Sequence, residues 1–418
     1  MFNDIPRNVW VRLVANLVGT TIYMAVFPFL ALLFSSIRGT AFTGSLLSVT
    51  VMLGYVVRLL GGYLADIYSR KRIVVYSNSI SAIAMTLMAL SFLVKTQSFA
   101  LLLVGYLLHS VVTPISGPSM QALIIDSTTP KIRKRVYTIT YWTMNIAASF
   151  GYAIGGYFYE KNHLLLFVLL AVSSLFTVLL YILFLQDSAV PRAKATYRNP
   201  FRDILNHYYI AVKDKQFVLT VLGYGMLIAG EDALAGFIGI RLSNSFKPIT
   251  IAGQYLTGVR MLSLLMMENA ILVALLSLFM SKATDRFSRR LVLIGSSSVY
   301  ALGFVLLSAS LDFWPLLLFG LINTIGETEA IPVIGAEQAN MMPEDKRASY
   351  IALSSLSQRE AKMIASSLIV LSGFVSPLVM STALSLILFS GISVMARGFF
   401  ADAAESGPFR QGVSRGED

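Results

Sequence analysis

The sequence predicts an all-α polytopic membrane protein with twelve transmembrane helices in two pseudo-symmetric halves of six. Three observations lead to this fold class. The 418 residues are 56% hydrophobic and only 13% charged, with a mean hydropathy of +0.71. Apolar runs of about 20 residues, the length that crosses a bilayer as a helix, recur along the chain. A short polar motif also occurs once in each half.

The apolar runs divide the chain into two halves, at 1–185 and 216–400. A polar linker at 186–215 is expected to carry an amphipathic helix on the inner membrane surface, and 401–418 form a polar tail. The predicted spans are 10–34, 41–64, 73–94, 99–125, 136–158 and 164–185, then 216–239, 253–280, 291–309, 313–338, 353–375 and 380–400. The first run lacks a clear cleavage site and is interpreted as an uncleaved span.

The distribution of basic residues predicts the topology. The chain has 33 Lys and Arg and a formal net charge of +11, and cations are retained in the cytoplasmic loops of membrane proteins. With both termini cytoplasmic, the predicted outer loops hold only Arg38, Lys95, Lys161, Arg241 and Lys247. The charge therefore indicates topology and not a nucleic-acid site.

Several function classes are disfavoured by what the sequence lacks. It has no cysteine, which excludes disulfides and thiolate metal sites. It also has no GxxxxGK[ST] phosphate loop and no HExxH motif. We therefore expect no cofactor, no metal, no enzymatic reaction and no coupling to ATP hydrolysis within this chain.

The repeated motif combines small residues, an aspartate and a group of cations at the end of an apolar run. It reads GYLADIYSRKR at 62–72 and SKATDRFSRR at 281–290. Asp66 and Asp285 hold equivalent places, 285 − 66 = 219 residues apart, as in an internal repeat. We expect a conformational latch at the inner membrane surface, formed by Gly62, Asp66, Arg70, Lys71, Asp285 and Arg289.

Charged residues inside apolar spans are the main candidates for function, because each costs about 2.5–3.5 kcal/mol on insertion scales. The strongest candidate is Glu327, near the middle of the tenth span. Burial disfavours the charged form of a carboxyl group, so Glu327 is a candidate for proton exchange or for binding a cationic substrate. The alternative is a fixed ion pair, for which Arg260 is the preferred partner.

Other residues complete the predicted sites. Asp66, Asp126 and Glu268 join Glu327 as proton-coupling candidates. Asp126 could also form the inner latch together with Asp66 and Arg70, the alternative being local helix-end electrostatics. Charges at the start of the eleventh span, including Lys362, are either interfacial anchors or part of the cavity wall. His109 is either hydrogen-bonded packing or a proton relay. The expected substrate-binding residues are Glu327, Arg260, Glu231, Asp232, Tyr141 and Trp142.

The first copy of the repeated motif resembles a signature of the major facilitator superfamily, GxLADxxxRK. The resemblance implies a transporter in which two six-helix halves surround a central cavity. In the fifth span, AASFGYAIGG resembles the antiporter motif of the same superfamily, with Ala147 in place of its first glycine and Tyr152 in place of its proline. Ordinary close packing of small residues is the alternative. The residues in question are Ala147, Gly151, Gly155 and Gly156.

Three further stretches, beginning at Met120, Arg241 and Asn323, resemble the proton-driven multidrug exporters of lactococci and other low-GC Gram-positive bacteria. Within them, Asp126, Arg260 and Glu327 match acidic and basic positions of those exporters, as Asp66 does elsewhere. The sequence departs from them at Thr140 and Ala235, where those exporters carry acidic residues.

The resemblance implies proton-coupled export of amphipathic, cationic compounds by a monomer in the plasma membrane of a Gram-positive bacterium. Its partners would be small amphipathic substrates, protons and membrane lipids, without nucleic acid. The alternatives are a lipid or lysolipid flippase, a proton-coupled nutrient importer, and a membrane sensor or assembly factor.

Overall fold

The computed structural model describes residues 5–93, 98–187, 209, 211–251, 253–276, 287–343 and 346–405. The first half contains α1 (Arg7–Val26), the 3-10 turn η1 (Phe27–Phe29), α2 (Leu30–Ile67), α3 (Arg70–Leu90), α4 (Phe99–Ser127), α5 (Pro130–Phe158) and α6 (His163–Phe184). The predicted linker at 186–215 and the tail at 401–418 lie mostly outside the described residues.

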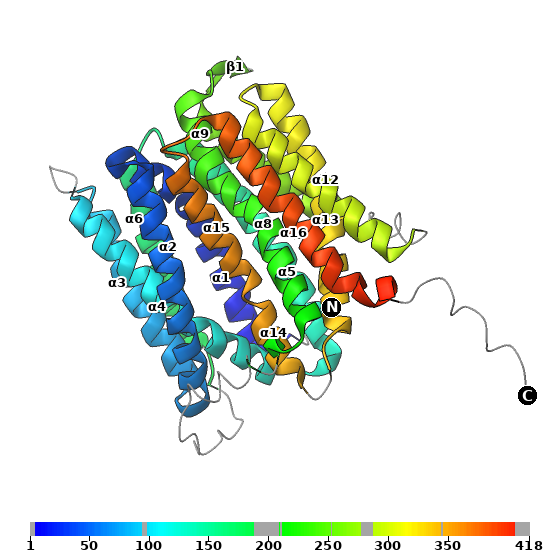
Figure 1. The fold of residues 1–418 in the computed structure, drawn as a ribbon. Coiled ribbons are helices and arrows are strands. Elements are labelled where there is room, and N and C mark those ends of the chain that lie inside the picture. Colours follow the sequence, from blue (N-terminus) through cyan, green and yellow to red (C-terminus); the bar gives the residue numbers. More distant parts are fainter. Residues whose placement is uncertain are drawn as a thin grey trace, which may run out of the picture.

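The second half contains α8 (Lys215–Ala233), the π-helical turn η2 (Leu234–Ile238), α9 (Gly239–Ser245), β1 (Ile249–Ile251), β2 (Gln254–Leu256), α10 (Gly258–Leu276), α12 (Arg289–Ala309), α13 (Phe313–Asn340), α14 (Arg347–Ser354), α15 (Ser357–Leu371) and α16 (Pro377–Glu405). Figure 1 shows the two sets of helices side by side, with β1 at the end of the bundle opposite to α14. The hairpin of β1 and β2 is not predicted from the sequence.

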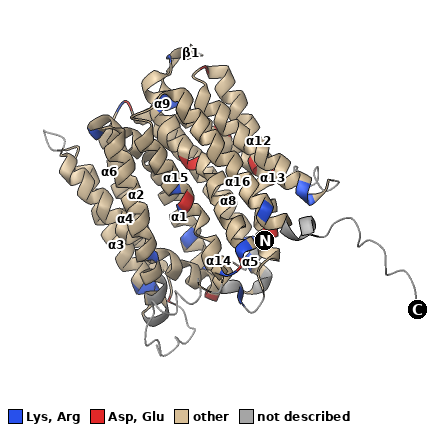
Figure 2. Cartoon of the chain, in the orientation of Figure 1, with Lys and Arg blue, Asp and Glu red and all other residues tan. Residues whose placement is uncertain are grey.

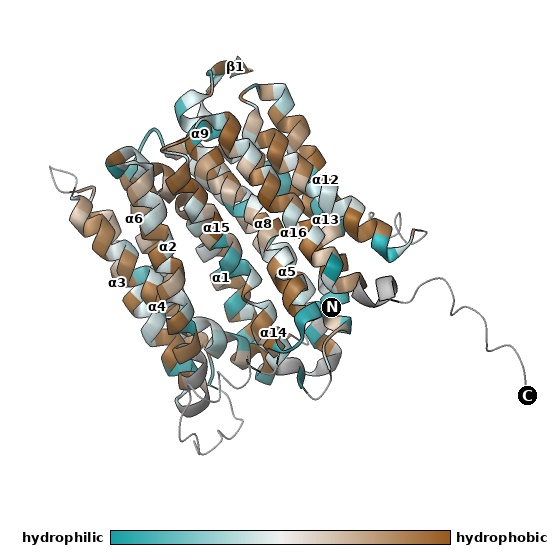
Figure 3. Cartoon of the chain, viewed as in Figure 1, coloured by the Kyte–Doolittle hydropathy of each residue, from teal (hydrophilic) through white to brown (hydrophobic). Residues whose placement is uncertain are grey.

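Most of each predicted span lies on a helix, but the predicted span 253–280 begins within the β1–β2 hairpin, and its residues 277–280 lie outside the described ranges. Within the described ranges, nine helical stretches are long and apolar enough to cross a membrane. The first of these, 7–61, holds two predicted spans, which Gly39 separates with a φ of 80° that favours glycine. The predicted span at 136–158 lies on α5, and most of the predicted span at 353–375 lies on α15, although it begins at the end of α14. Hydrophobic residues predominate along the helices (Figure 3), and many large apolar side chains are exposed, as expected of helices that face lipid.

The internal repeat is visible in how α3 and α12 begin. Each has 21 residues, and each starts after a serine whose side chain accepts a hydrogen bond from a backbone N–H of the first turn. Ser69 accepts from Arg72 at 3.2 Å, and Ser288 accepts from Leu291 at 3.3 Å. These caps satisfy N–H groups that a helix start leaves unpaired, and they lie 219 residues apart like the two motif aspartates.

The halves meet along two helix pairs, α2 with α15 and α5 with α10. Gly44 of α2 lies against the backbone of α15 at Ser366, and Gly156 of α5 lies against Ser263 of α10. The Ser263 hydroxyl also donates to the backbone oxygen of Tyr152 at 2.5 Å. These contacts lie toward the end that carries Gly39 and the β1–β2 hairpin, predicted to face outside. The structure is closed at that end.

The small-residue motif of α5 serves two different interfaces. A side chain at Gly151 or Gly155 would meet the backbone of α1 within the same half, whereas one at Gly156 would meet Ser263 of the opposite half. Ala147 is fully buried beside them. Close packing explains the first two glycines, and Gly156 belongs to the contact between the halves.

We predict that Gly151→Leu lowers the thermal unfolding midpoint, because overpacking a fitted interface costs about 1–3 kcal/mol. Gly156→Leu is expected to leave that midpoint closer to wild type and to open the closed end. Cross-linking of Thr40→Cys with Gly373→Cys, adjacent residues of α2 and the α15 end, measures this closure in a chain without native cysteine.

Gly295→Leu is the matched control, since a side chain at this helical glycine meets open space. Equal cross-link yields in wild type and Gly156→Leu would contradict the assignment of Gly156 to the moving interface.

Candidate functional site

A central cavity of about 360 Å³ lies where the two halves meet. Both halves contribute to its wall, which combines aromatic side chains with a small number of charged and amide groups. The volume is within the range of pockets that hold small organic ligands. Its polar and aromatic lining residues are Tyr23, Phe27, Thr50, Tyr106, Tyr152, Glu231, Asp232, Asn269, Phe304, Asn323, Glu327, Lys362 and Ser366.

Glu327 lies on the cavity wall and is held by an amide. Asn269 of α10 donates one hydrogen bond from Nδ2 to Glu327 Oε2 at 2.6 Å and another to Thr324 Oγ1 at 3.1 Å. Thr324 and Glu327 are three residues apart on α13 and so share a face of that helix. Asn269 thus fixes the carboxyl group while leaving it open to the cavity.

Glu231 and Asp232 reach the same cavity from α8. They lie directly before η2, where Gly236 departs from helical geometry with φ −86° and ψ −116°. Such π-helical turns are frequent at functional sites, because they redirect the residues around them. Glu231 is exposed to solvent although it lies deep in the bundle, since the cavity brings water to it.

Lys362, one of the charges predicted to be either an interfacial anchor or part of the cavity wall, belongs to the cavity wall. Lys362, Ala365, Ser366 and Ile369 of α15 all line the cavity, at the spacing of one helix face. The neighbouring charges point elsewhere: the Arg359 guanidinium lies 4.3 Å from the centre of the Tyr55 ring of α2. Figure 2 shows both basic and acidic residues on α15 within the bundle.

The predicted pairing of Arg260 with Glu327 is wrong. Arg260 lies near the start of α10, where its guanidinium donates to the backbone oxygen of Tyr255 in the hairpin. It also lies 5.7 Å from the centre of the Tyr157 ring. Arg260 and Asn269 are nine residues apart on α10, about 13 Å along the axis at 1.5 Å per residue, so Asn269 reaches Glu327 and Arg260 does not.

Three other predicted residues are absent from the described cavity wall. Glu268 faces Gly320 of α13, outside the cavity lining. Tyr141 is half-exposed and lies within electrostatic range of Glu327, and Trp142 follows it on α5. Neither of these two lines the cavity in this conformation.

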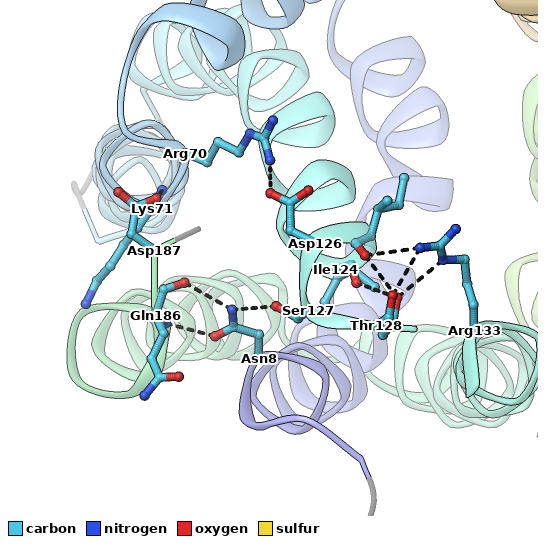
Figure 4. Close-up of polar contacts among 11 residues, drawn as sticks. Asn8, Arg70, Lys71, Ile124, Asp126, Ser127, Thr128, Arg133, Gln186 and Asp187 are labelled. Carbon is cyan, nitrogen blue, oxygen red and sulfur yellow. Dashed lines mark hydrogen bonds and ion pairs between the residues drawn. The ribbon is translucent and has the colours of Figure 1, made fainter. Parts of the chain in front are cut away.

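Two residues of the predicted inner latch, Arg70 and Arg289, form ion pairs within their own halves. Arg70 at the start of α3 pairs with Asp126 near the end of α4, as Figure 4 shows. The second half repeats this arrangement, with Arg289 of α12 and Glu337 of α13 2.5 Å apart. The surroundings of Gly62, the side chain of Asp66 and the whole of Asp285 are not described, so their part in the latch stays a prediction.

Asp187, which the sequence analysis did not single out, holds the start of α3. Its carboxylate accepts from the Ser69 hydroxyl at 2.6 Å and from the Lys71 backbone N–H at 3.2 Å. The ammonium of Lys71 donates to the backbone oxygen of Ile182 at 3.1 Å. A carboxylate at a helix N-terminus is favourable, so Lys71 and Asp187 tie α3 to the end of α6.

A second, smaller pocket of about 200 Å³ lies inside the first half and is lined mainly by hydroxyl groups and His109. His109 is 3% exposed, and its Nδ1 lies 2.8 Å from Ser81 Oγ and 3.1 Å from Thr113 Oγ1. This geometry is that of hydrogen-bonded packing. Residue 300, equivalent to Ser81 by the offset of 219, is a fully buried tyrosine, so the second half is filled at this position.

The fold and the central cavity define a secondary transporter of the helical, two-half type. The chain belongs to the Major Facilitator Superfamily, whose family model matches residues 12–240 and 232–415. It is 27% identical over 379 residues to a Na⁺, Li⁺, K⁺/H⁺ antiporter of Planococcus maritimus, covering 87% of this chain and 88% of that protein. It is also 21% identical over 329 residues to an uncharacterized MFS-type transporter of Bacillus subtilis, covering 78% and 77% of the two chains.

Solved structures of POT family transporters share the fold. One in complex with a thioalcohol-conjugated peptide has a TM-score of 0.75 at 13% identity, covering 97% of this chain and all of that one. Another, in complex with 5-aminolevulinic acid, has a TM-score of 0.73 at 14% identity, covering 96% and 97%. At these identities the likeness concerns the fold alone. None of these proteins is named as a multidrug exporter, so that narrower resemblance stays a prediction.

We predict that the Arg70–Asp126 pair stabilises the first half and stays intact through the transport cycle. Arg70→Gln and Asp126→Asn should each lower the unfolding midpoint, and the double variant should lose less than the sum, because the residues share one interaction. The measurement is a double-mutant cycle of thermal unfolding in detergent.

Spin labels on α3 and α4 beside this pair provide the second readout. We expect the distance between the two labels to be the same with and without a pH gradient. A distance that changes when the gradient is applied would instead support a latch that opens.

Proposed function

We propose that the protein is a proton-coupled antiporter that exports amphipathic, cationic compounds across the plasma membrane by alternating access. The observation that carries the proposal is the cavity itself: Glu231, Asp232 and Glu327 converge on one water-accessible space between the halves. The antiporter name of the Planococcus maritimus relative supports the same direction of coupling.

Antiport requires that proton and substrate exclude one another at a shared site. A carboxyl group meets this requirement, because its oxygens hold either a proton or the charge of a cation. The amide of Asn269 can donate to Glu327 in either condition, so Asn269 orients the group without deciding its occupant. The aromatic wall suits the apolar part of an amphipathic cation, which ring faces also attract.

Coupling to movement follows from a difference in affinity. A bound proton or substrate shifts the balance between two conformations only by binding one of them better. The described structure is closed where α2 meets α15 and α5 meets α10. Glu327 and Asn269 lie on α13 and α10, and α10 itself forms the contact with α5. The exchange of a proton for a cation at Glu327 therefore takes place next to an interface that must open during transport.

Proton-coupled uptake of a small zwitterion is the second candidate function. It is favoured by the presence of Lys362 and three carboxyl groups in one cavity, which offers partners for both ends of an amino acid or peptide. The POT structures, whose described ligands include a conjugated peptide and 5-aminolevulinic acid, share the fold. Uptake of this kind moves the substrate in the same direction as the protons, whereas the proposed export moves it in the opposite direction.

The decisive experiment uses purified protein in liposomes with an imposed pH gradient. We predict that protons moving down the imposed gradient drive the monocationic dye ethidium in the opposite direction. Glu327→Gln should abolish this gradient-driven efflux while leaving gradient-independent exchange measurable. Gln keeps the size of the side chain and its partner Asn269 but cannot exchange a proton.

Glu160→Gln is the matched control, because it neutralises an exposed glutamate that lies outside the cavity. Parallel assays with a labelled dipeptide and a labelled lipid distinguish the other candidates. Dipeptide accumulation with inward proton flow would establish uptake instead, and lipid movement without dye movement would establish flipping. Unchanged gradient-driven efflux by Glu327→Gln would remove this residue from coupling.

A further inference from the structure

Lys362 is the sole basic residue among the described residues that line the central cavity. Its side chain is exposed to the cavity, and the wall of the same cavity carries the carboxyl groups of Glu231 and Asp232. An ammonium group is costly at this depth in a membrane protein, so its presence demands a balancing charge. The antiport described above makes no use of it.

The setting of Lys362 leaves its ammonium free to move. The ion pairs of Arg70 and Arg289 lie elsewhere, and no carboxylate of a described residue forms an ion pair with Lys362. The flexible stem of lysine lets a single anchoring point on α15 serve several positions of the charge. Arg359, three residues earlier, is instead engaged with the ring of Tyr55.

We propose that Lys362 is a built-in competitor of the cationic substrate: its ammonium balances Glu231 and Asp232 in the empty cavity, and an incoming cation must displace it. The inference rests on the proposed function, because it assumes that the cavity receives cations. It adds the residue that limits how much positive charge the cavity accepts.

A charge rule follows from this role. The repulsion between Lys362 and a ligand is proportional to the charge of the ligand. Neutralising Lys362 should therefore tighten the binding of a monocation on the order of tenfold. For a dication of similar shape, the same substitution should tighten binding by about the square of that factor. For a neutral amphiphile, the affinity should hardly change. A loss of packing alone would change the affinity for all three ligands without regard to their charge.

The experiment measures equilibrium binding of ethidium, a monocation, and propidium, a related dication, to the purified full-length protein without a gradient. Lys362→Gln should tighten propidium binding more than ethidium binding, and Lys362→Arg, which keeps the charge, should resemble wild type. Lys161→Gln is the matched control. It removes the same charge from an exposed lysine that lies over the Tyr157 ring at 3.8 Å, outside the cavity.

Equal changes for the two dyes, or weaker binding of both to Lys362→Gln, would overturn the competitor role. Unchanged dye binding together with intact gradient-driven efflux would also overturn it while leaving the proposed function in place. Failure of both dyes to bind any of the proteins would contradict the proposed function itself.

Discussion

The structure depends on a single constraint: carboxyl groups placed within membrane-spanning helices need partners that lipid cannot supply. The protein meets it in three ways at one place. The gap between the halves brings water to Glu231, the amide of Asn269 donates to Glu327, and Lys362 supplies a positive charge from α15. The π-helical turn after Asp232 fits the same constraint, because irregular backbone within a membrane is tolerated where it lines a cavity.

The internal repeat explains how the rest of the bundle supports this cavity. Ser69 and Ser288 begin equivalent helices, and the ion pairs Arg70–Asp126 and Arg289–Glu337 fasten equivalent helix ends. Each half is thus held together by its own inner-end contacts, whereas the halves join mainly near the opposite end. Two bodies joined in this way suit a rocking movement about the central cavity.

Most of the fold could be predicted from the sequence, because an apolar run about as long as a bilayer is thick indicates a membrane-spanning helix. The offset of 219 residues between the two motifs indicated the internal repeat. The sequence also predicted Glu231, Asp232 and Glu327 because charges in apolar runs are conspicuous. It did not predict Asn269, since an uncharged amide carries no such signal. It also misplaced the partner of Glu327, because which face of α10 meets α13 depends on helix rotation, and hydropathy does not define that rotation.

The central claim is that proton and cation compete for the carboxyl groups of one cavity. The most direct measurement is proton release on substrate binding, followed with a pH indicator in weakly buffered solutions of purified protein near neutral pH. The account predicts that saturating ethidium releases protons from the wild type and that Glu327→Gln releases fewer at the same occupancy. Dye binding without proton release would contradict shared occupancy and, with it, the antiport mechanism.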